Sequence, residues 1–180
     1  MRNINPPTLV TLMRMALVVP VVYLLLEGYG LGALAVFLFA SLLDWVDGQL
    51  ARRLQQQTNL GAMLDHLADK LLICGAMITL VYVHPHPVSL IATLVVVGRD
   101  LVMGGLREYW LKQGLQERAM VNLFGKWKTT LQMAAICLLL LAHWQAPHDM
   151  LQLAHLAYGL VTLVTLLSLV NYLKPMPGAQ

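Results

Sequence analysis

The sequence predicts an all-α, polytopic membrane protein with six transmembrane helices and both termini in the cytoplasm. Of its 180 residues, 58% are hydrophobic and only 12% are charged, whereas a soluble domain carries about a quarter charged residues. The apolar residues also gather into stretches that approach the ~20 residues needed to cross a bilayer core. These stretches are 8–26, 31–43 extending to about 50, 62–83, 88–106, 129–142 and 150–173.

The basic residues lie on one side of this arrangement. The connections at 27–32, 83–89 and 142–150 contain no Lys or Arg. The 12 basic residues lie at the termini, near 52–53, in the long connection at 107–128, or in helices toward those ends. Because Lys and Arg are enriched in cytoplasmic loops, both termini should face the cytoplasm. The positive charge should then meet anionic membrane lipids, and we expect no nucleic-acid partner.

The chain is predicted to form a single domain over residues 1–180, because no linker, internal repeat or low-complexity tract divides it. The first apolar stretch lacks the small-residue cleavage site of a signal peptide, so we expect it to be retained as a helix. Cys74 and Cys137 lie in separate spans without CxxC spacing. They are expected to pack as small hydrophobic residues.

Four aspartates interrupt the second and third apolar stretches. Asp44 and Asp47 lie three residues apart on one stretch, and Asp65 and Asp69 lie four apart on the next. Each pair therefore shares a face of its helix, and both pairs lie at a similar depth from the polar turn at 53–59. An ionisable side chain in a span costs about 2.5–3.5 kcal/mol on insertion scales. This concentration of acids favours a functional site over the alternatives of helix pairing or a proton relay.

Carboxylates at one depth cannot all stay ionised unless a positive charge lies between them. Oxygen ligands select hard cations, and four carboxylates suit two ions of Mg²⁺ or Mn²⁺. Two such ions can stabilise both the attacking and the leaving oxygen of a phosphoryl displacement. The aspartates therefore predict metal-assisted phosphate chemistry at the membrane.

The aspartates belong to a longer pattern in the second and third spans. It consists of Asp44, Asp47, Gly48, Ala51, Arg52, eight intervening residues, Gly61, Asp65 and Asp69. This pattern resembles the signature of the CDP-alcohol phosphatidyltransferase family, and the resemblance extends over nearly the whole chain. It implies a six-helix membrane enzyme in which an alcohol attacks the diphosphate of a CDP-linked substrate and CMP is released. It also implies a homodimer, as an expectation for the family.

The resemblance assigns roles to individual residues. It makes the four aspartates the ligands of two divalent cations and makes Asp69 the general base. The residues assigned to the nucleotide and its diphosphate are Asn5, Thr8, Gly48, Ala51, Arg52 and Gly61. Outside this signature, the small residues would indicate close helix packing. His66 replaces the proline that usually follows the third aspartate, and on an ideal helix it points away from the metal-binding face.

The segments 5–14, 106–110 and 125–130 resemble the phosphatidylglycerophosphate synthase branch of the family. This resemblance implies CDP-diacylglycerol as donor and glycerol 3-phosphate as acceptor. A phosphorylated acceptor needs cations, and Arg can bind a phosphate through two parallel hydrogen bonds. The candidates are Arg14, Arg99, Arg107, Lys126 and Lys128, of which Arg107 and Lys126 are favoured. The alternative for Arg14 and Lys128 is snorkelling to the interface, and for Arg99 and Arg107 it is an ion pair with the adjacent acid.

We therefore predict a multi-pass enzyme of a bacterial inner membrane with its active site toward the cytoplasm. The alternatives are another acceptor (serine, an inositol phosphate or phosphatidylglycerol), a membrane transporter, and a non-catalytic scaffold. A transporter would distribute its acids along a pathway or in repeated halves, and a scaffold would have lost part of the signature. The histidines of the outer connections are expected to be solvated, because the turn at 84–87 is short, stiffened by proline and without a nearby carboxylate. They are His84, His86, His143 and His148.

Overall fold

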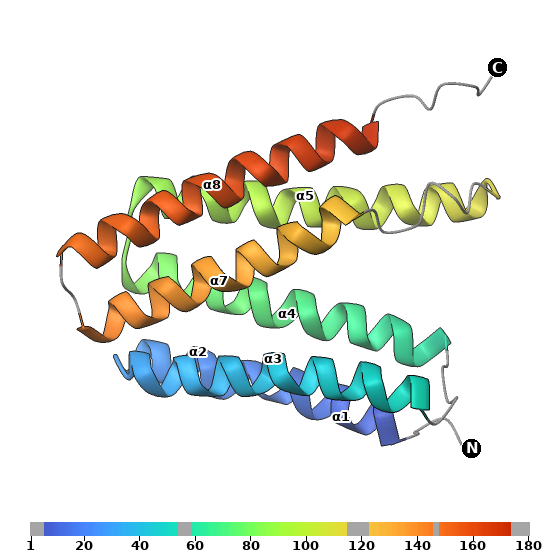
Figure 1. The fold of residues 1–180 in the computed structure, drawn as a ribbon, viewed down its shortest axis with the longest axis horizontal. Coiled ribbons are helices and arrows are strands. Elements are labelled where there is room, and N and C mark those ends of the chain that lie inside the picture. The colour runs from blue at the N-terminus through green and yellow to red at the C-terminus, as the bar shows by residue number, and fades with distance from the viewer. Residues whose placement is uncertain (1–5, 54–58, 115–122, 146–147, 174–180) are drawn as a thin grey trace.

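The computed structural model describes residues 6–53, 59–114, 123–145 and 148–173, and each regular element in these ranges is an α-helix. Figure 1 shows an elongated bundle in which the helices run roughly alongside one another. The helices α1, α2, α3 and α4 form one side, α5 and α8 form the other, and α7 contacts both. Their bounds are Pro6–Ala16 (α1), Val18–Leu26 (α2), Gly30–Arg53 (α3), Asn59–Val83 (α4), Pro87–Lys112 (α5), Leu123–Gln145 (α7) and His148–Leu173 (α8).

Among the described residues, four helical segments are long and apolar enough to cross a membrane, namely Thr8–Leu26, Met63–Val83, Pro87–Trp110 and Leu151–Val170. Two shorter apolar segments, Gly30–Asp44 and Thr130–Ala142, correspond to the second and fifth predicted spans. The class of helical membrane protein is therefore confirmed for the described residues. The crossing by the two shorter segments, and the cytoplasmic position of the termini, stay predictions.

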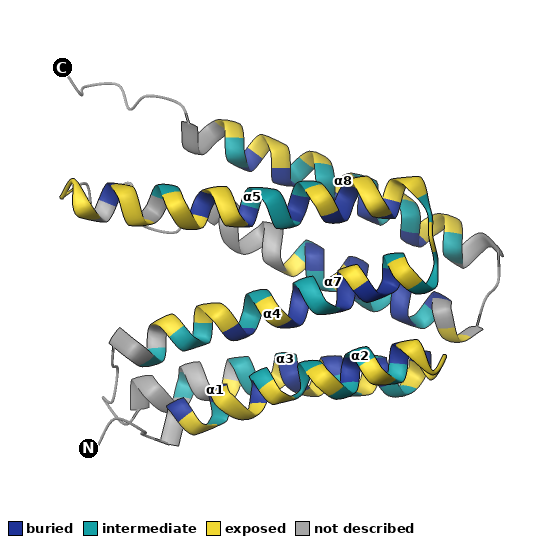
Figure 2. Ribbon diagram, turned by 180° about the vertical axis from the view of Figure 1, so that it is seen from behind, coloured by how far each residue is buried: buried dark blue, intermediate teal, exposed yellow. Residues whose placement is uncertain are grey.

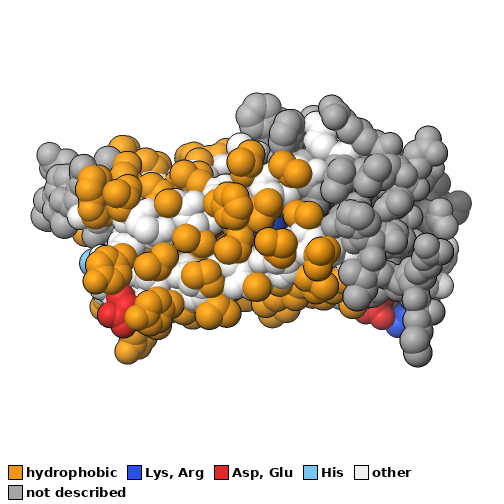
Figure 3. All heavy atoms as spheres, turned by 90° about the horizontal axis from the view of Figure 1, so that it is seen from below, with side chains coloured by type: hydrophobic (Ala, Val, Ile, Leu, Met, Phe, Trp, Pro, Cys, Tyr) orange, Lys and Arg blue, Asp and Glu red, His pale blue; other side chains and the backbone are white. Residues whose placement is uncertain are grey.

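The outer surface of the bundle is apolar. Figure 3 shows one long face on which hydrophobic side chains cover most of the described surface. Large exposed hydrophobic side chains are also found on α2, α5 and α8, for example at Val19, Leu101 and Leu156. A surface of this extent is suited to lipid chains rather than water.

The first span consists of two helices, because Pro20 bends it. Proline lacks an amide hydrogen, and its ring clashes with the carbonyl four positions earlier, which belongs to Ala16. Hydrogen bonds nevertheless continue through the bend, from the Leu17 amide to the Met13 carbonyl at 3.0 Å and from the Val21 amide to the Leu17 carbonyl at 3.2 Å. The span therefore bends between α1 and α2 without being interrupted.

Small residues allow the helices to pack closely within the bundle. Figure 2 shows buried positions along the inner sides of α2, α3, α4, α5 and α7. A close approach occurs at Gly75 of α4, where an added Cβ would lie 3.0 Å from Cγ1 of Val18 on α2. Close packing at small residues is typical of membrane helices, and here it fixes α4 against the first span. The turn from α2 into α3 uses Gly28 at φ 79°, a conformation that favours glycine.

Candidate active site

The predicted aspartates lie on α3 and α4, which neighbour each other near the end of the bundle where α1 begins (Figure 1). The helix α3 continues through Asp47 to Arg53, and α4 begins at Asn59, before Asp65 and Asp69. Each pair of aspartates is thus helical, as the spacing predicted. Asp44 and Asp65 are partly exposed, with 39% and 51% of their side-chain surfaces accessible.

Arg14 of α1 joins the two aspartate-bearing helices. Its Nη1 forms an ion pair with Oδ1 of Asp44 on α3. Its Nη2 donates to Oδ1 of Asp65 at 2.6 Å and to the backbone carbonyl of Asp65 at 2.8 Å. Only 1% of the Arg14 side-chain surface is accessible. One buried guanidinium therefore brings carboxylates from α3 and α4 together, and Arg14 binds these acids instead of snorkelling to the interface.

The other signature residues within the described ranges lie on α1, α3 and α4. Asp69 lies one turn beyond Asp65 on α4 and is half-buried. Gly61 lies in the first turn of α4, and Thr8 of α1 is buried. Four residues of the signature belong to the last turns of α3, but only their backbone is described. They are Asp47, Gly48, Ala51 and Arg52. Asn5 lies outside the described residues.

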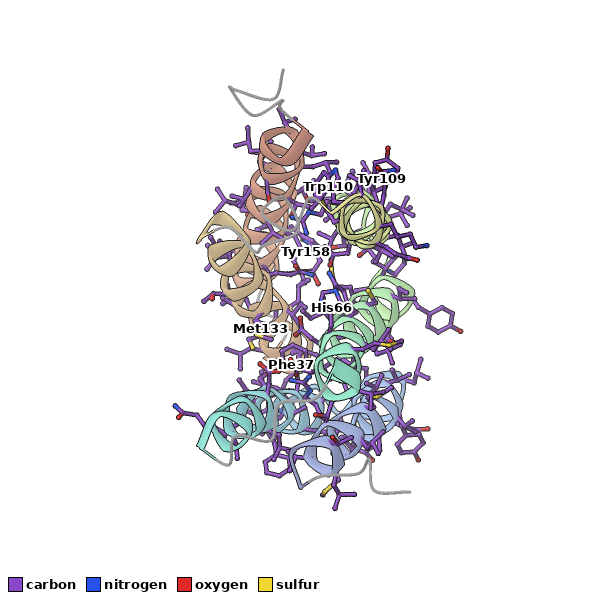
Figure 4. All side chains as sticks on the ribbon, turned by 90° about the vertical axis from the view of Figure 1, so that its right-hand side faces the viewer. Phe37, His66, Tyr109, Trp110, Met133 and Tyr158 are labelled. Carbon is purple, nitrogen blue, oxygen red and sulfur yellow. The ribbon has the colours of Figure 1, made fainter. Side chains whose placement is uncertain are left out.

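His66 projects from α4 toward the side of α5 and α8, away from α1 and α3 (Figure 4). This is the direction expected for the position after Asp65 on a helix. The histidine is exposed. With His66 in place of the family's usual proline, α4 is a continuous helix through Asp65 and Asp69.

A second cluster of charged residues lies on the other side of α4. Nζ of Lys70 is 2.5 Å from Oδ2 of Asp100 on α5, and Nη1 of Arg99 is 3.0 Å from the other oxygen, Oδ1. Nη2 of Arg99 also donates to Oγ of Ser168 on α8 at 3.0 Å. Of the two interpretations of Arg99, the structure shows the ion pair with Asp100. Lys70 was not among the predicted site residues, although an ionisable residue within an apolar span was the signal that could have found it.

The remaining candidates for binding the acceptor phosphate lie on α5 and α7. Arg107 belongs to α5, and Lys126 and Lys128 belong to the first turns of α7. Their side chains lie outside the described set. Their assignment to the acceptor stays a prediction.

One histidine of the outer connections makes a tertiary contact at the opposite end of the bundle. The ring of His86 stacks on that of His155 of α8, with centroids 3.7 Å apart and planes inclined by 20°. Nδ1 of His86 also accepts a hydrogen bond from the Val88 amide at 3.3 Å. A tertiary contact therefore joins the turn before α5 to α8, while His86 keeps part of its surface accessible and its solvation stays a prediction. The side chains of His143 and His148 lie outside the described set.

The described donors fit the expected metal site in part. Among the side chains that the structure describes, no three acidic, histidine or cysteine groups form a cluster able to hold a metal ion. Asp47, one of the four predicted ligands, is not among those side chains. Asp44 and Asp65 nevertheless converge on a single positive charge, and their oxygens are the donors that hard cations such as Mg²⁺ prefer. The donor chemistry therefore fits a divalent cation.

The sequence matches the CDP-alcohol phosphatidyltransferase family over residues 4–170. The chain belongs to this family, which confirms the family inferred from the aspartate signature. It is 39% identical over 176 residues to the CDP-diacylglycerol–glycerol-3-phosphate 3-phosphatidyltransferase of Escherichia coli K12, with 94% of this chain and 93% of the relative covered. The protein of the same name from Haemophilus influenzae is 32% identical over 179 residues, with 97% and 95% covered. The one from Salmonella typhimurium is 38% identical over 180 residues, with 97% and 96% covered.

Proposed function

We propose that this protein transfers the phosphatidyl group of CDP-diacylglycerol to glycerol 3-phosphate, giving phosphatidylglycerophosphate and CMP. Relatives that align with almost the whole chain carry the name of this activity. The structural observation that supports it most directly is the convergence of Asp44 and Asp65 on one buried positive charge. This convergence brings carboxylate oxygens from two helices close together, where they could hold the hard cations that a diphosphate substrate needs.

Two divalent cations, Mg²⁺ or Mn²⁺, would be held by Asp44, Asp47, Asp65 and Asp69. When bound, they would neutralise diphosphate charge and lower the pKa of the acceptor hydroxyl. Arg14 orients two of these ligands. It fixes Asp65 through both the carboxylate and the backbone carbonyl and fixes Asp44 through one oxygen. Groups that orient ligands in this way tune the geometry of metal sites.

Asp69 would act as the general base, as the family signature implies, and it lies one turn from Asp65 on the same helix. Its carboxylate accepts the proton of the glycerol 3-phosphate hydroxyl, and the hydroxyl oxygen attacks the phosphorus that carries diacylglycerol. The bond from that phosphorus to the bridging oxygen breaks, and CMP leaves with this oxygen. The nucleotide would be bound by the small and polar residues of the signature, which are Asn5, Thr8, Gly48, Ala51, Arg52 and Gly61.

The acceptor phosphate would be bound by cations of α5 and α7. Arg14 is engaged by Asp44 and Asp65, and Arg99 is engaged by Asp100 and Ser168. The proposed acceptor-binding residues are therefore the other three of the five candidates, Arg107, Lys126 and Lys128. Arg107 can grip a phosphate through two hydrogen bonds, and the lysines add positive charge.

The same proposal places the protein in a bacterial inner membrane as a single domain over residues 1–180. The distribution of basic residues supports six spans, cytoplasmic termini and an active site toward the cytoplasm. A homodimer is proposed from the family alone. The surrounding membrane lipids would contact the apolar outer surface of the bundle.

The test is a purified, detergent-solubilised enzyme supplied with CDP-diacylglycerol and either Mg²⁺ or Mn²⁺. Glycerol 3-phosphate, serine, an inositol phosphate and phosphatidylglycerol are offered in parallel, and CMP release is measured. We expect release with glycerol 3-phosphate, loss of release after chelation, and recovery when the metal is restored. Release with serine alone would refute the acceptor assignment, and full activity after chelation would refute the role of the metal.

A further inference from the structure

The cluster of charged residues on α4, α5 and α8 joins the two sides of the bundle. Asp100 of α5 is its centre, with Lys70 of α4 at 2.5 Å and Arg99 of its own helix at 3.0 Å. Arg99 extends the connection to Ser168 of α8, 3.0 Å away. The cluster therefore links the helix that carries Asp65 and Asp69 to two helices of the opposite side.

These groups are held largely away from both lipid and water. Only 6% of the Asp100 side-chain surface and 10% of that of Arg99 are accessible, and the value for Lys70 is 26%. All the residues of the cluster lie within segments long and apolar enough to cross a membrane. A charge at such a position is tolerated chiefly where it is paired. A slip of α5 along α4 by one helical turn, about 5.4 Å, would separate Asp100 from Lys70 and break their ion pair.

The cluster acts on the same stretch of α4 as Arg14 does. Arg14 of α1 holds Asp65, and Asp100 of α5 holds Lys70, which directly follows Asp69. The two attachment points, Asp65 and Lys70, are five residues apart on α4, so they lie on different faces of that helix. Together they fix both the rotation of α4 about its axis and its depth against α5.

We infer that Lys70, Asp100, Arg99 and Ser168 form a positioning network that holds the Asp69 region of α4 in register with α5. The helix α5 also carries Arg107, seven residues and therefore about two turns beyond Asp100 in the direction of Lys112. The network would thus hold the proposed base and the proposed acceptor-binding arginine at the separation that glycerol 3-phosphate requires. This part of the inference rests on the proposed function. The four residues act through the helices they join, so they are positioning residues.

The test is a double-mutant cycle of Asp100→Asn, Lys70→Gln and the combined variant. We expect each single change to lower kcat/KM for glycerol 3-phosphate by about tenfold or more, because small misplacements of reacting groups have effects of this size. Binding of CDP-diacylglycerol in the presence of Mn²⁺ should fall much less than kcat/KM, because three of the four proposed metal ligands lie outside the Asp69 region that the network holds and Arg14 still holds Asp44 and Asp65. The combined variant should be no worse than the more impaired single variant, because both changes remove the same link.

Two further variants complete the design. Asp100→Glu keeps the charge and should recover most of the activity that Asp100→Asn loses. Lys112→Gln is the matched control, because it removes an exposed ion pair of the same helix, in which Nζ of Lys112 is 2.7 Å from Glu108, and it should leave kcat/KM unchanged.

Two results would overturn the inference. One is a folded Asp100→Asn protein, with wild-type elution in detergent, that has normal kcat/KM. The other is a combined variant whose loss is the product of the two single losses, because Lys70 would then act independently of Asp100. If Asp100→Asn does not fold, kcat/KM is measured for Lys70→Gln and Ser168→Ala instead. Normal kcat/KM in both of these variants would overturn the inference. Should the wild type use another acceptor, the proposed function fails, and the cycle is run with that acceptor.

Discussion

Replacing Arg14 with glutamine should destabilise the protein, because it removes the cation that Asp44 and Asp65 share. Breaking a buried ion pair by removing one partner costs about 3–5 kcal/mol when the remaining charge stays dry. Here the acids are 39% and 51% accessible, so water can partly solvate them, and we expect a loss of about 2–4 kcal/mol. For a chain of this length, such a loss lowers Tm by roughly 5–15 °C.

The measurement is thermal unfolding of the purified protein in detergent without divalent metal, followed by tryptophan fluorescence. Arg14→Lys should give an intermediate Tm, because an ammonium keeps the charge but lacks the planar fork that bridges two carboxylates. Lys112→Gln, at an exposed ion pair, should leave Tm nearly unchanged. Adding Mn²⁺ should raise the Tm of the wild type, because a ligand that binds only the folded state stabilises it. The rise should be smaller for Arg14→Gln, because the variant lacks the group that orients Asp44 and Asp65.

An Arg14→Gln protein that unfolds within about 2 °C of the wild type would refute this prediction, since such a shift corresponds to less than about 1 kcal/mol. The result would mean that Asp44 and Asp65 are stabilised without the guanidinium. A large loss of Tm in Arg14→Gln, with no response to Mn²⁺ in either the variant or the wild type, would retain the ion pair but contradict the proposed metal site.

Three further predictions concern the base, the packing and the topology. Asp69→Asn should lower CMP release by at least about 10²-fold while CDP-diacylglycerol still binds, and a near-normal rate would remove Asp69 from the role of base. Gly75→Leu should lower the free energy of unfolding by about 1–3 kcal/mol, because even an added Cβ would lie 3.0 Å from Val18. Thermal unfolding should show that Val18→Ala restores part of this stability, and an unchanged Tm in Gly75→Leu would contradict the close packing. The topology can be tested with single cysteines in a variant without Cys74 and Cys137. Pro85→Cys, on the proposed outer side, should react with an impermeant maleimide in intact cells, and Gln113→Cys, on the proposed cytoplasmic side, should react only after permeabilisation. The reverse pattern would contradict the proposed topology.

The helices were predictable from the sequence, because their signal is local. Apolar stretches of the right length mark spans whatever their neighbours are, and α3 ends at Arg53 and α4 begins at Asn59, on either side of the polar stretch in the sequence, as expected. The bend in the first span was not predicted, although Pro20 within an apolar stretch is its signal. The apolar segments Gly30–Asp44 and Thr130–Ala142 are short because each of their helices also contains polar and charged residues, among them proposed site residues.

The meeting of Asp44 and Asp65 was also predictable, because helix periodicity and depth depend only on positions in the chain. A positive charge between the carboxylates was expected from metal ions, and an arginine in this position was not predicted. Arg14 was assigned to the acceptor phosphate or to the interface, and the structure pairs it with the aspartates. Which cation meets which acid depends on the rotation and contacts of whole helices. Asp100 illustrates the same limit: its pairing with the adjacent Arg99 was among the interpretations of the sequence, whereas its pairing with Lys70 of α4 was not.

Arg14 is synthesised before the acids that pair with it. It leaves the ribosome ahead of Asp44, and Asp65 is 51 residues further along the chain. Until the helices that carry these acids follow, the charge lacks both of them, and its long side chain must reach toward the headgroups. Insertion of this span then relies on its other residues, and Thr8–Leu26 is the most apolar of the four long segments. Synthesis of α4 supplies the second acid, so membrane insertion of the arginine and assembly of the aspartate site are completed together.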